Sequence, residues 1–170
     1  ALSARGLVYP CFCTPEELEF SRKAQLAAGR QPRYARTCTK LSADEVERRL
    51  AAGQRPALRF RVPDHQVVEF VYHVHGPQRF LSDDIGDFIV CRADGSVSFF
   101  LGNALDDSAM GITLVVRGDD HLANTPRQLL MLQALGMRQP EYAHLPLVLA
   151  ETGTPLSKRA GAASLSDLPA

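Results

Sequence analysis

The sequence lacks any apolar run that approaches the roughly 18 residues of a membrane span. Its first ten residues, ALSARGLVYP, also lack the long apolar stretch of a secretory signal. We therefore expect a protein of the cytoplasm with no membrane partner. With 170 residues and 45% hydrophobic content, the chain has material for one ordinary core or for two small subdomains side by side.

The sequence also lacks an excess of positive or negative charge, with 19 Lys or Arg and 19 Asp or Glu. The formal net charge of zero argues against a protein that coats nucleic acid. The charges are nevertheless uneven, because residues 1–60 hold 11 Lys or Arg against 6 Asp or Glu, and the remainder holds 8 against 13. This asymmetry suits a protein that meets phosphates in its first part and a small molecule in its second. Two solvated surfaces of opposite sign explain it equally well.

Cysteine is scarce, with residues only at positions 11, 13, 38 and 91. The first three cluster before and within a basic segment, whereas a disulfide framework would spread them. Without a secretory signal, metal binding is favoured over disulfide bonding. Cys91 lies inside a strand pattern and is expected to be a core residue.

Two helices are predicted near the start of the chain. Thr14-Pro15-Glu16-Glu17 combines a threonine cap, an early proline and a glutamate three residues after the cap, which predicts a helix to about Gly29. Residues 42–45 repeat the capping pattern and predict a second helix that ends near Gly53.

Short runs of β-branched and aromatic residues follow, and they predict strands at 57–62, 67–72, 87–92 and 96–101. Asp94-Gly95 between the last two is typical of a hairpin turn. Residues 1–97 are therefore expected to form a mixed subdomain of two helices and a small antiparallel sheet.

The rest of the chain, residues 98–170, has a different pattern. ITLVVRG at 112–118 is mostly apolar without alternation, which favours a strand buried on both faces of a parallel sheet. A helix is predicted from Thr125 to Gly136, and LPLVLA at 145–150 is predicted to be a second buried strand. Strand, helix and strand form one crossover unit of a parallel α/β sheet, which is too small to stand alone.

A basic loop follows that strand. In PLSKRAG, Ser157, Lys158 and Arg159 lie at the carboxyl end of the predicted strand, where a mobile lysine can fold over a triphosphate. By itself, such a loop is more often a solvated turn.

The surrounding residues closely resemble the glutamyl-tRNA synthetases, class I enzymes that activate glutamate with ATP and transfer it to tRNA. The likeness is carried by DDSAMGITLVVRGDDHLANTPRQLLMLQALG and PEYAHLPLVLAETGTPLSKR, whose last five residues are similar to the family's KMSKS loop. The resemblance implies the second half of a Rossmann-like catalytic sheet, preceded by an inserted α+β subdomain that binds the tRNA acceptor stem.

The resemblance also implies a glutamate site. Arg117 matches the arginine that pairs with the side-chain carboxylate of the substrate, and a guanidinium fork suits a carboxylate. Asn103 matches an asparagine that helps to hold the amino acid. Asp120 and His121 fall beside glutamate and ATP in relatives. Phe99 stands where the family has tyrosine, so a hydroxyl is missing. Lys158 is expected to contact the ATP phosphates.

A zinc knuckle is implied in the first part of the chain. Cys11, Cys13 and Cys38 match three ligands found in a subset of these synthetases, and zinc takes four tetrahedral ligands. The histidine that some relatives use as the fourth ligand is absent, since Lys40 stands there. Tyr34 matches the tyrosine used by the related glutamyl-queuosine tRNA(Asp) synthetases. We expect structural zinc on these four residues, although a decayed site with reduced thiols fits the same pattern.

The inserted subdomain grips the acceptor end of tRNA in the family. The resemblance therefore implies that the basic run Arg30, Arg33, Arg36 and Lys40 meets the phosphates of tRNA(Glu).

A HIGH-type motif, which completes the ATP site of class I synthetases, is absent from the 170 residues. We therefore expect the chain alone to be inactive, although its parent uses ATP, Mg and glutamate. Three readings remain open at this point: a segment of a glutamate-tRNA ligase, a truncated paralogue that binds tRNA without catalysis, and the queuosine-modifying relative. The RGDDHLANTPRQL run and the SKR loop favour the first.

Overall fold

The computed structural model describes residues 2–70, 73–74, 76–149 and 153–155. The strands are β1 (Val8–Cys11), β2 (Ala57–Phe60), β3 (Val67–Phe70), β4 (Gln78–Leu81), β5 (Phe88–Cys91), β6 (Leu114–Gly118) and β7 (Glu141–Leu145). The α-helices are α1 (Pro15–Ala27), α2 (Ala43–Ala51), α3 (Ser82–Ile85), α4 (Phe99–Ala109) and α5 (Thr125–Leu135). Short 3-10 helices are η1 (Ser3–Arg5), η2 (Thr37–Lys40) and η3 (Asp119–Asn124). No helix of the described part is long and apolar enough to cross a membrane.

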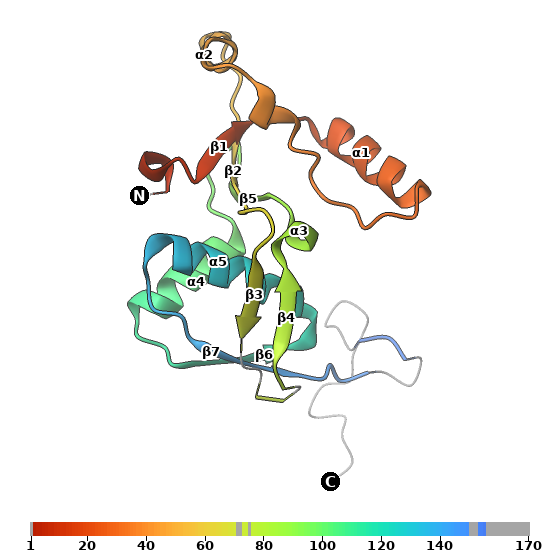
Figure 1. Cartoon of the computed structure of the whole chain (residues 1–170), viewed down its shortest axis with the longest axis vertical. Coiled ribbons are helices and arrows are strands. Elements are labelled where there is room, and N and C mark those ends of the chain that lie inside the picture. Colours follow the sequence, from red (N-terminus) through yellow and green to blue (C-terminus); the bar gives the residue numbers. More distant parts are fainter. Residues whose placement is uncertain (1, 71–72, 75, 150–152, 156–170) are drawn as a thin grey trace, which may run out of the picture.

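The first part of the chain forms the predicted antiparallel sheet with two helices beside it. The strand order is β1-β2-β5, and β3 pairs with β4 in a separate hairpin. The helices α1 and α2 project away from the sheet and bury none of their residues (Figure 1). The capping box of α1 is confirmed, because Thr14 accepts from the Glu17 amide and Glu17 accepts from the Thr14 amide.

The strand predicted at 96–101 is wrong. Only Val97 pairs with Cys91, in an isolated bridge, and the chain then enters α4 at Phe99. The turn at Asp94-Gly95 is present, with Gly95 at φ 88°. The alternation of SVSFFL is too short to outweigh the helical spacing of Phe100, Leu101 and Ala104, which face the core.

The second part contains the predicted crossover. The strands β6 and β7 are parallel, with Leu114 opposite Glu141 and Gly118 opposite Leu145, and α5 lies between them in the sequence. Gly136 ends α5 in the left-handed conformation, as the sequence predicts. This unit and the neighbouring antiparallel strands give a mixed α/β fold, as expected.

The burial predicted for both faces of the first strand is wrong, because none of the residues of β6 is buried and Leu114 and Val116 are exposed. The second predicted strand begins earlier than expected. It occupies Glu141–Leu145, where Tyr142, Ala143 and His144 are buried. Residues 145–149 of the predicted strand 145–150 are exposed. The apolar run LPLVLA misled the prediction, because the residues that pair with β6 and are buried are the three consecutive residues Tyr142, Ala143 and His144.

The main core joins residues from both parts of the chain. Phe60 stacks on Phe88 at 5.4 Å between ring centroids, and the same cluster includes Met131 and Tyr142. The β3–β4 hairpin is tied to β7, since the His73 amide donates to the Tyr142 carbonyl at 3.3 Å. The two predicted regions therefore share one packed interior, and the boundary at residue 97 stays a prediction.

Candidate functional site

The four residues predicted to bind zinc converge. Cys11 ends β1, Cys13 follows it, and Cys38 lies in η2. The three sulfur atoms all lie within 4.8 Å of one another. The hydroxyl of Tyr34 lies 3.4 Å from the sulfurs of both Cys11 and Cys13. The Cys38 amide donates to that hydroxyl at 3.0 Å, which fixes the phenol among the thiols.

This donor set fits a tetrahedral zinc ion. A Zn–S bond of about 2.3 Å implies sulfur atoms roughly 3.8 Å apart, and Cys13 and Cys38 are 3.6 Å apart. Burial raises the pKa of Cys13 to about 12 and raises that of the Tyr34 phenol. Burial also acts to raise the pKa of Cys11, but Tyr34 and the Arg59 guanidinium lower it below its ordinary value. A bound cation would favour the deprotonated form of every ligand.

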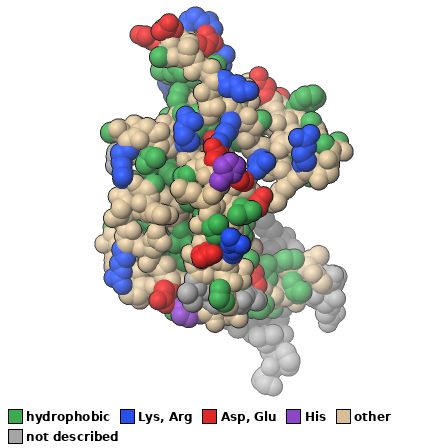
Figure 2. Space-filling model, viewed as in Figure 1, with side chains coloured by type: hydrophobic (Ala, Val, Ile, Leu, Met, Phe, Trp, Pro, Cys, Tyr) green, Lys and Arg blue, Asp and Glu red, His purple; other side chains and the backbone are tan. Residues whose placement is uncertain are grey.

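A basic loop and a cleft lie beside the cysteine cluster. Lys and Arg side chains gather over the upper part of the face in Figure 2, around β1, α1 and α2. A cleft of about 760 Å³ separates α1 from α3, and Arg30, Arg33 and His65 line it. Arg30 and Lys40 are exposed. Arg33 is exposed too, and it donates to the Asp83 carbonyl.

Arg36, also predicted to meet phosphate, has a role within the fold. Its guanidinium donates to both carboxylate oxygens of buried Asp87, at 3.0 and 3.1 Å. It also pairs with Asp64 at 2.6 Å. Arg36 has a positive φ of 56°, rare for a residue other than glycine, and these bonds hold it there. Fewer of its donors remain for an outside phosphate.

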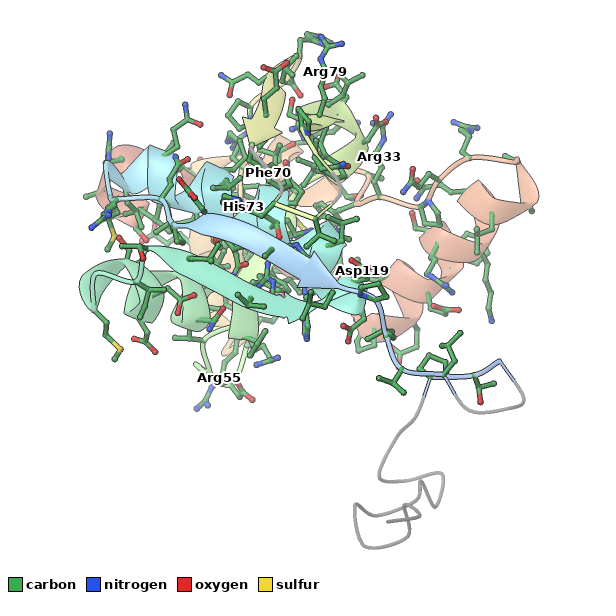
Figure 3. The ribbon with its side chains drawn as sticks, turned by 90° about the horizontal axis from the view of Figure 1, so that it is seen from below. Arg33, Arg55, Phe70, His73, Arg79 and Asp119 are labelled. Atoms are coloured by element: carbon green, nitrogen blue, oxygen red, sulfur yellow. The ribbon has the colours of Figure 1, made fainter. Side chains whose placement is uncertain are left out.

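The guanidinium of Arg117 is positioned at the carboxyl end of β6. Its Nε donates to Nε2 of His144 at 3.0 Å, and one terminal nitrogen donates to the Thr125 hydroxyl at 2.6 Å. The group also lies over the ring of Tyr142, 5.1 Å from its centroid. Figure 3 shows β6 and β7 side by side, with Asp119 directly after β6. Strand ends of this kind are where open α/β sheets bind ligands.

The other residues of the predicted glutamate site surround the start of α5. Asn103 accepts from the buried amide of Gln128 at 3.0 Å, and Gln128 lies three residues after Thr125, the partner of Arg117. The rings of Phe99 and His121 are 5.8 Å apart. The first turn of α5 thus links α4, which carries Asn103 and Phe99, to Arg117.

Asp120 and His121 lie next to each other in η3. One oxygen of Asp120 is 3.7 Å from Nε2 of His121, and Asn124 lies 3.2 Å from the other ring nitrogen. An added Cβ at Gly118 would lie 2.6 Å from the Asp120 carboxylate and 2.9 Å from Leu147. The close approach therefore favours glycine at the end of β6.

Several residues of this region were not found from the sequence. His144, Thr125 and Gln128 are fully buried and position Arg117 and Asn103. Burial raises the pKa of Asp107, against the opposing charge of Arg117. These groups come from separate elements, so the spacing of residues along the sequence does not predict that they are in contact. Ser157, Lys158 and Arg159 of the basic loop lie outside the described residues.

A parallel unit with an arginine at its strand end is the kind of ligand site that many α/β folds carry, and the comparison with known families identifies the class of this one. The model described as "tRNA synthetases class I (E and Q), catalytic domain" matches residues 1–168. The chain belongs to this family of glutamate- and glutamine-specific synthetases.

Individual relatives are glutamate–tRNA ligases. Glutamate–tRNA ligase 1 of Methylococcus capsulatus is 59% identical over 167 residues, which cover 98% of this chain and 36% of the relative. Glutamate–tRNA ligase 2 of Alkalilimnicola ehrlichii is 58% identical over 99% of this chain and 35% of its own length. The chain thus spans about a third of the relatives that it matches.

Solved structures show the same likeness. The glutamate-tRNA synthetase of Elizabethkingia anophelis matches with a TM-score of 0.78 and 29% identity, over 91% of this chain and 33% of that one. A glutamate tRNA ligase of Elizabethkingia meningosepticum, solved in complex with its amino acid, gives the same score and covers 32% of that chain.

Proposed function

We propose that this chain is part of a glutamate–tRNA ligase, which activates glutamate with ATP and Mg and transfers it to the 3′ end of tRNA(Glu). The observation that supports this most directly is the fixed guanidinium of Arg117 at the end of β6, in a chain that matches the family's catalytic domain. A planar guanidinium that His144 and Thr125 hold in place is suited to bind the side-chain carboxylate of glutamate.

The residues around Arg117 have distinct roles in this proposal. Arginine can only donate, so Nε2 of His144 is the acceptor and carries no proton. A neutral His144 orients the fork without competing for the substrate carboxylate. Asn103 binds the amino acid, and Phe99 with His121, next to Asp120, forms the adjoining wall. Lys158, with Ser157 and Arg159, meets the ATP phosphates, whose developing charge Mg also offsets.

A chimera tests the assignment of Arg117. In this chimera, the chain described here replaces the matching 167-residue segment of the Methylococcus capsulatus ligase. Glutamate-dependent exchange of pyrophosphate into ATP is expected to persist in the chimera. Arg117→Lys keeps the charge but removes the fork, so the KM for glutamate should rise at least about tenfold while the KM for ATP changes little. Equal glutamate KM values in both chimeras would refute the role.

The 170 residues alone are expected to be inactive in the same exchange assay. They contain no HIGH-type motif, so part of the transition-state charge on the α-phosphate goes unmet. Clear glutamate-dependent turnover by this chain would overturn that expectation.

We further infer that Cys11, Cys13, Cys38 and Tyr34 hold a structural zinc ion that ties β1 to η2. Mass spectrometry of the native chain is expected to find one zinc per chain. Cys13→Ser should lose it, whereas Cys91→Ser, at a cysteine outside the cluster, should keep it. A metal-free native chain, or equal zinc in both variants, would contradict the site.

The cleft beside the zinc site is proposed to receive the acceptor stem of tRNA. Arg30 and Arg33 line this cleft and are exposed, whereas Lys40 is exposed in η2 outside the lining of the cleft. Because Arg36 is bonded to Asp87, its contribution to phosphate binding should be the smallest of the four.

A further inference from the structure

A buried cation lies against the cysteine cluster and has no role in the proposals above. Arg59, in β2, is only 6% exposed. Its guanidinium lies over the ring of Tyr34, 3.8 Å from the ring centroid. One terminal nitrogen donates to the Asp87 carbonyl at 3.3 Å, and the buried Nε has no hydrogen-bond partner among the described residues.

Such a placement is costly unless a negative charge compensates it. Moving a charged group out of water costs several kcal/mol or more in the absence of pairing. Among the described residues, no carboxylate forms an ion pair with Arg59, and Asp87 offers it only a carbonyl oxygen. Its polar neighbours include Tyr34, whose ring lies under the guanidinium, and also Tyr9 and Cys11.

We propose that Arg59 is a positioning residue of the metal site, which supplies the counter-charge to an anionic set of ligands and holds the Tyr34 ring by a cation–π contact. This inference rests on the proposed zinc site. Three thiolates and a phenolate around Zn²⁺ carry a net charge of −2, because each ligand releases its proton to solvent on binding. The fixed charge of Arg59 would reduce this to −1 at a site where Arg59, Cys11 and Cys38 are buried.

The geometry explains why a tyrosine serves at this site. The guanidinium stacked on the ring fixes the orientation of the phenol, and its charge would offset the negative charge of a metal-bound phenolate. The backbone amide of Cys38 donates to the same oxygen at 3.0 Å. Arg59 and this amide therefore stabilise the same negative charge from two sides.

The test compares zinc affinities, measured by competition with a chromophoric chelator at one pH. Arg59→Gln should weaken zinc binding at least tenfold, the range seen when a residue behind a metal ligand is removed. Arg59→Lys, which keeps the charge, should stay within about threefold of the native chain. Arg61→Gln is the matched control, since Arg61 also lies over a tyrosine ring, that of Tyr9 at 4.9 Å, but is exposed.

A double-mutant cycle separates this role from a merely structural one. The Tyr34→Phe chain has no phenolate at this position. In that chain, Arg59→Gln should lower the logarithm of the zinc affinity by less than half as much as it does in the native chain. Cobalt-loaded chains give a second readout, because Arg59→Gln should change the ligand-to-metal absorption bands and Arg61→Gln should not. Circular dichroism of the metal-free chains checks that each variant folds.

Each outcome decides the proposal. Native-like zinc affinity in Arg59→Gln refutes the role of Arg59 but leaves the zinc site intact. Equal losses of zinc affinity in Arg59→Lys and Arg59→Gln refute the role of Arg59 as a counter-charge. If Arg59→Gln folds poorly, Arg59→Lys still decides the proposal, because a loss of zinc affinity in a folded chain that keeps the charge also refutes this role. A native chain that takes up no zinc refutes the metal site itself, and the inference with it.

Discussion

His144 connects the proposed glutamate site to pH. Burial and the charge of Arg117 hold the pKa of this histidine below its ordinary value of 6.5. The folded state therefore binds fewer protons here than the unfolded chain, so the stability from neutral His144 is present above pH 6.5 and is lost as the pH falls through the lowered folded pKa. Because Nε2 must accept from Arg117, protonation would also release the guanidinium.

We predict that the free energy of unfolding decreases between about pH 7.5 and about pH 5.5, a range in which histidine titrates and most carboxylates do not. Denaturant unfolding of His144→Gln is the comparison, and the variant should show a smaller decrease than the native chain. His65 and His73 pair with carboxylates and are unchanged in both chains. Identical pH profiles would show that His144 is not the group responsible.

Asp87 is the buried anion that joins the basic loop to the sheet. It accepts from the Tyr9 hydroxyl at 2.6 Å and from the Val62 amide at 2.9 Å, besides both bonds from Arg36. Asp87→Asn should lower the free energy of unfolding by about 2–4 kcal/mol, because a buried charged pair loses one partner while Arg36 keeps some access to water. Urea unfolding measures this.

The control for Asp87 is a nearby acid on the surface. Asp84→Asn alters an exposed carboxylate in α3 and should change the free energy of unfolding by no more than about 0.5 kcal/mol. If the two variants unfold at the same denaturant concentration, the bonds to Asp87 add nothing to stability.

At the scale of elements, α1 depends on its cap more than on packing. None of its residues is buried, so the reciprocal bonds of Thr14 and Glu17 are a large part of what holds its first turn. Thr14→Ala should destabilise the helix by about 1 kcal/mol. Hydrogen exchange of the α1 amides should accelerate, whereas that of β2 should not.

Ser42→Ala offers a matched comparison, since Ser42 caps α2 through the Glu45 amide at 3.2 Å. It should accelerate exchange in α2 and leave α1 unchanged. Uniform acceleration across α1, α2 and β2 after either substitution would mean that the helices do not open independently.

The elements also show how far the sequence could predict the fold. Caps and breakers are local, so α1, α2, α5 and the turn at Asp94-Gly95 were predicted close to their observed limits. The beginning of α4 and the position of β7 were not predicted correctly, because each depends on which apolar residues pack against other elements in the core. Candidate ligands were found through family motifs, whereas His144, Thr125 and Arg59 act through contacts between elements that no spacing encodes.

At the scale of the whole molecule, one core joins the first part of the chain, to which we assign tRNA binding, to the second part, to which we assign glutamate binding. Phe60 and Phe88 of the antiparallel sheet pack in the same cluster as Met131 and Tyr142 of the parallel unit. This shared interior holds the β1-β2-β5 sheet and the parallel unit with Arg117 in one packed body.

The measurement that tests this account most directly is a titration of the zinc-loaded chain with tRNA(Glu) at about 50 mM and about 200 mM salt. We predict binding that weakens with salt, and Arg30→Ala and Arg33→Ala, two substitutions in the cleft, should each reduce the salt slope by about one. Arg55→Ala, an exposed arginine outside the cleft, should leave the slope unchanged. Absence of tRNA binding, or slopes that are equal in all variants, would contradict the assignment of this cleft to the acceptor stem.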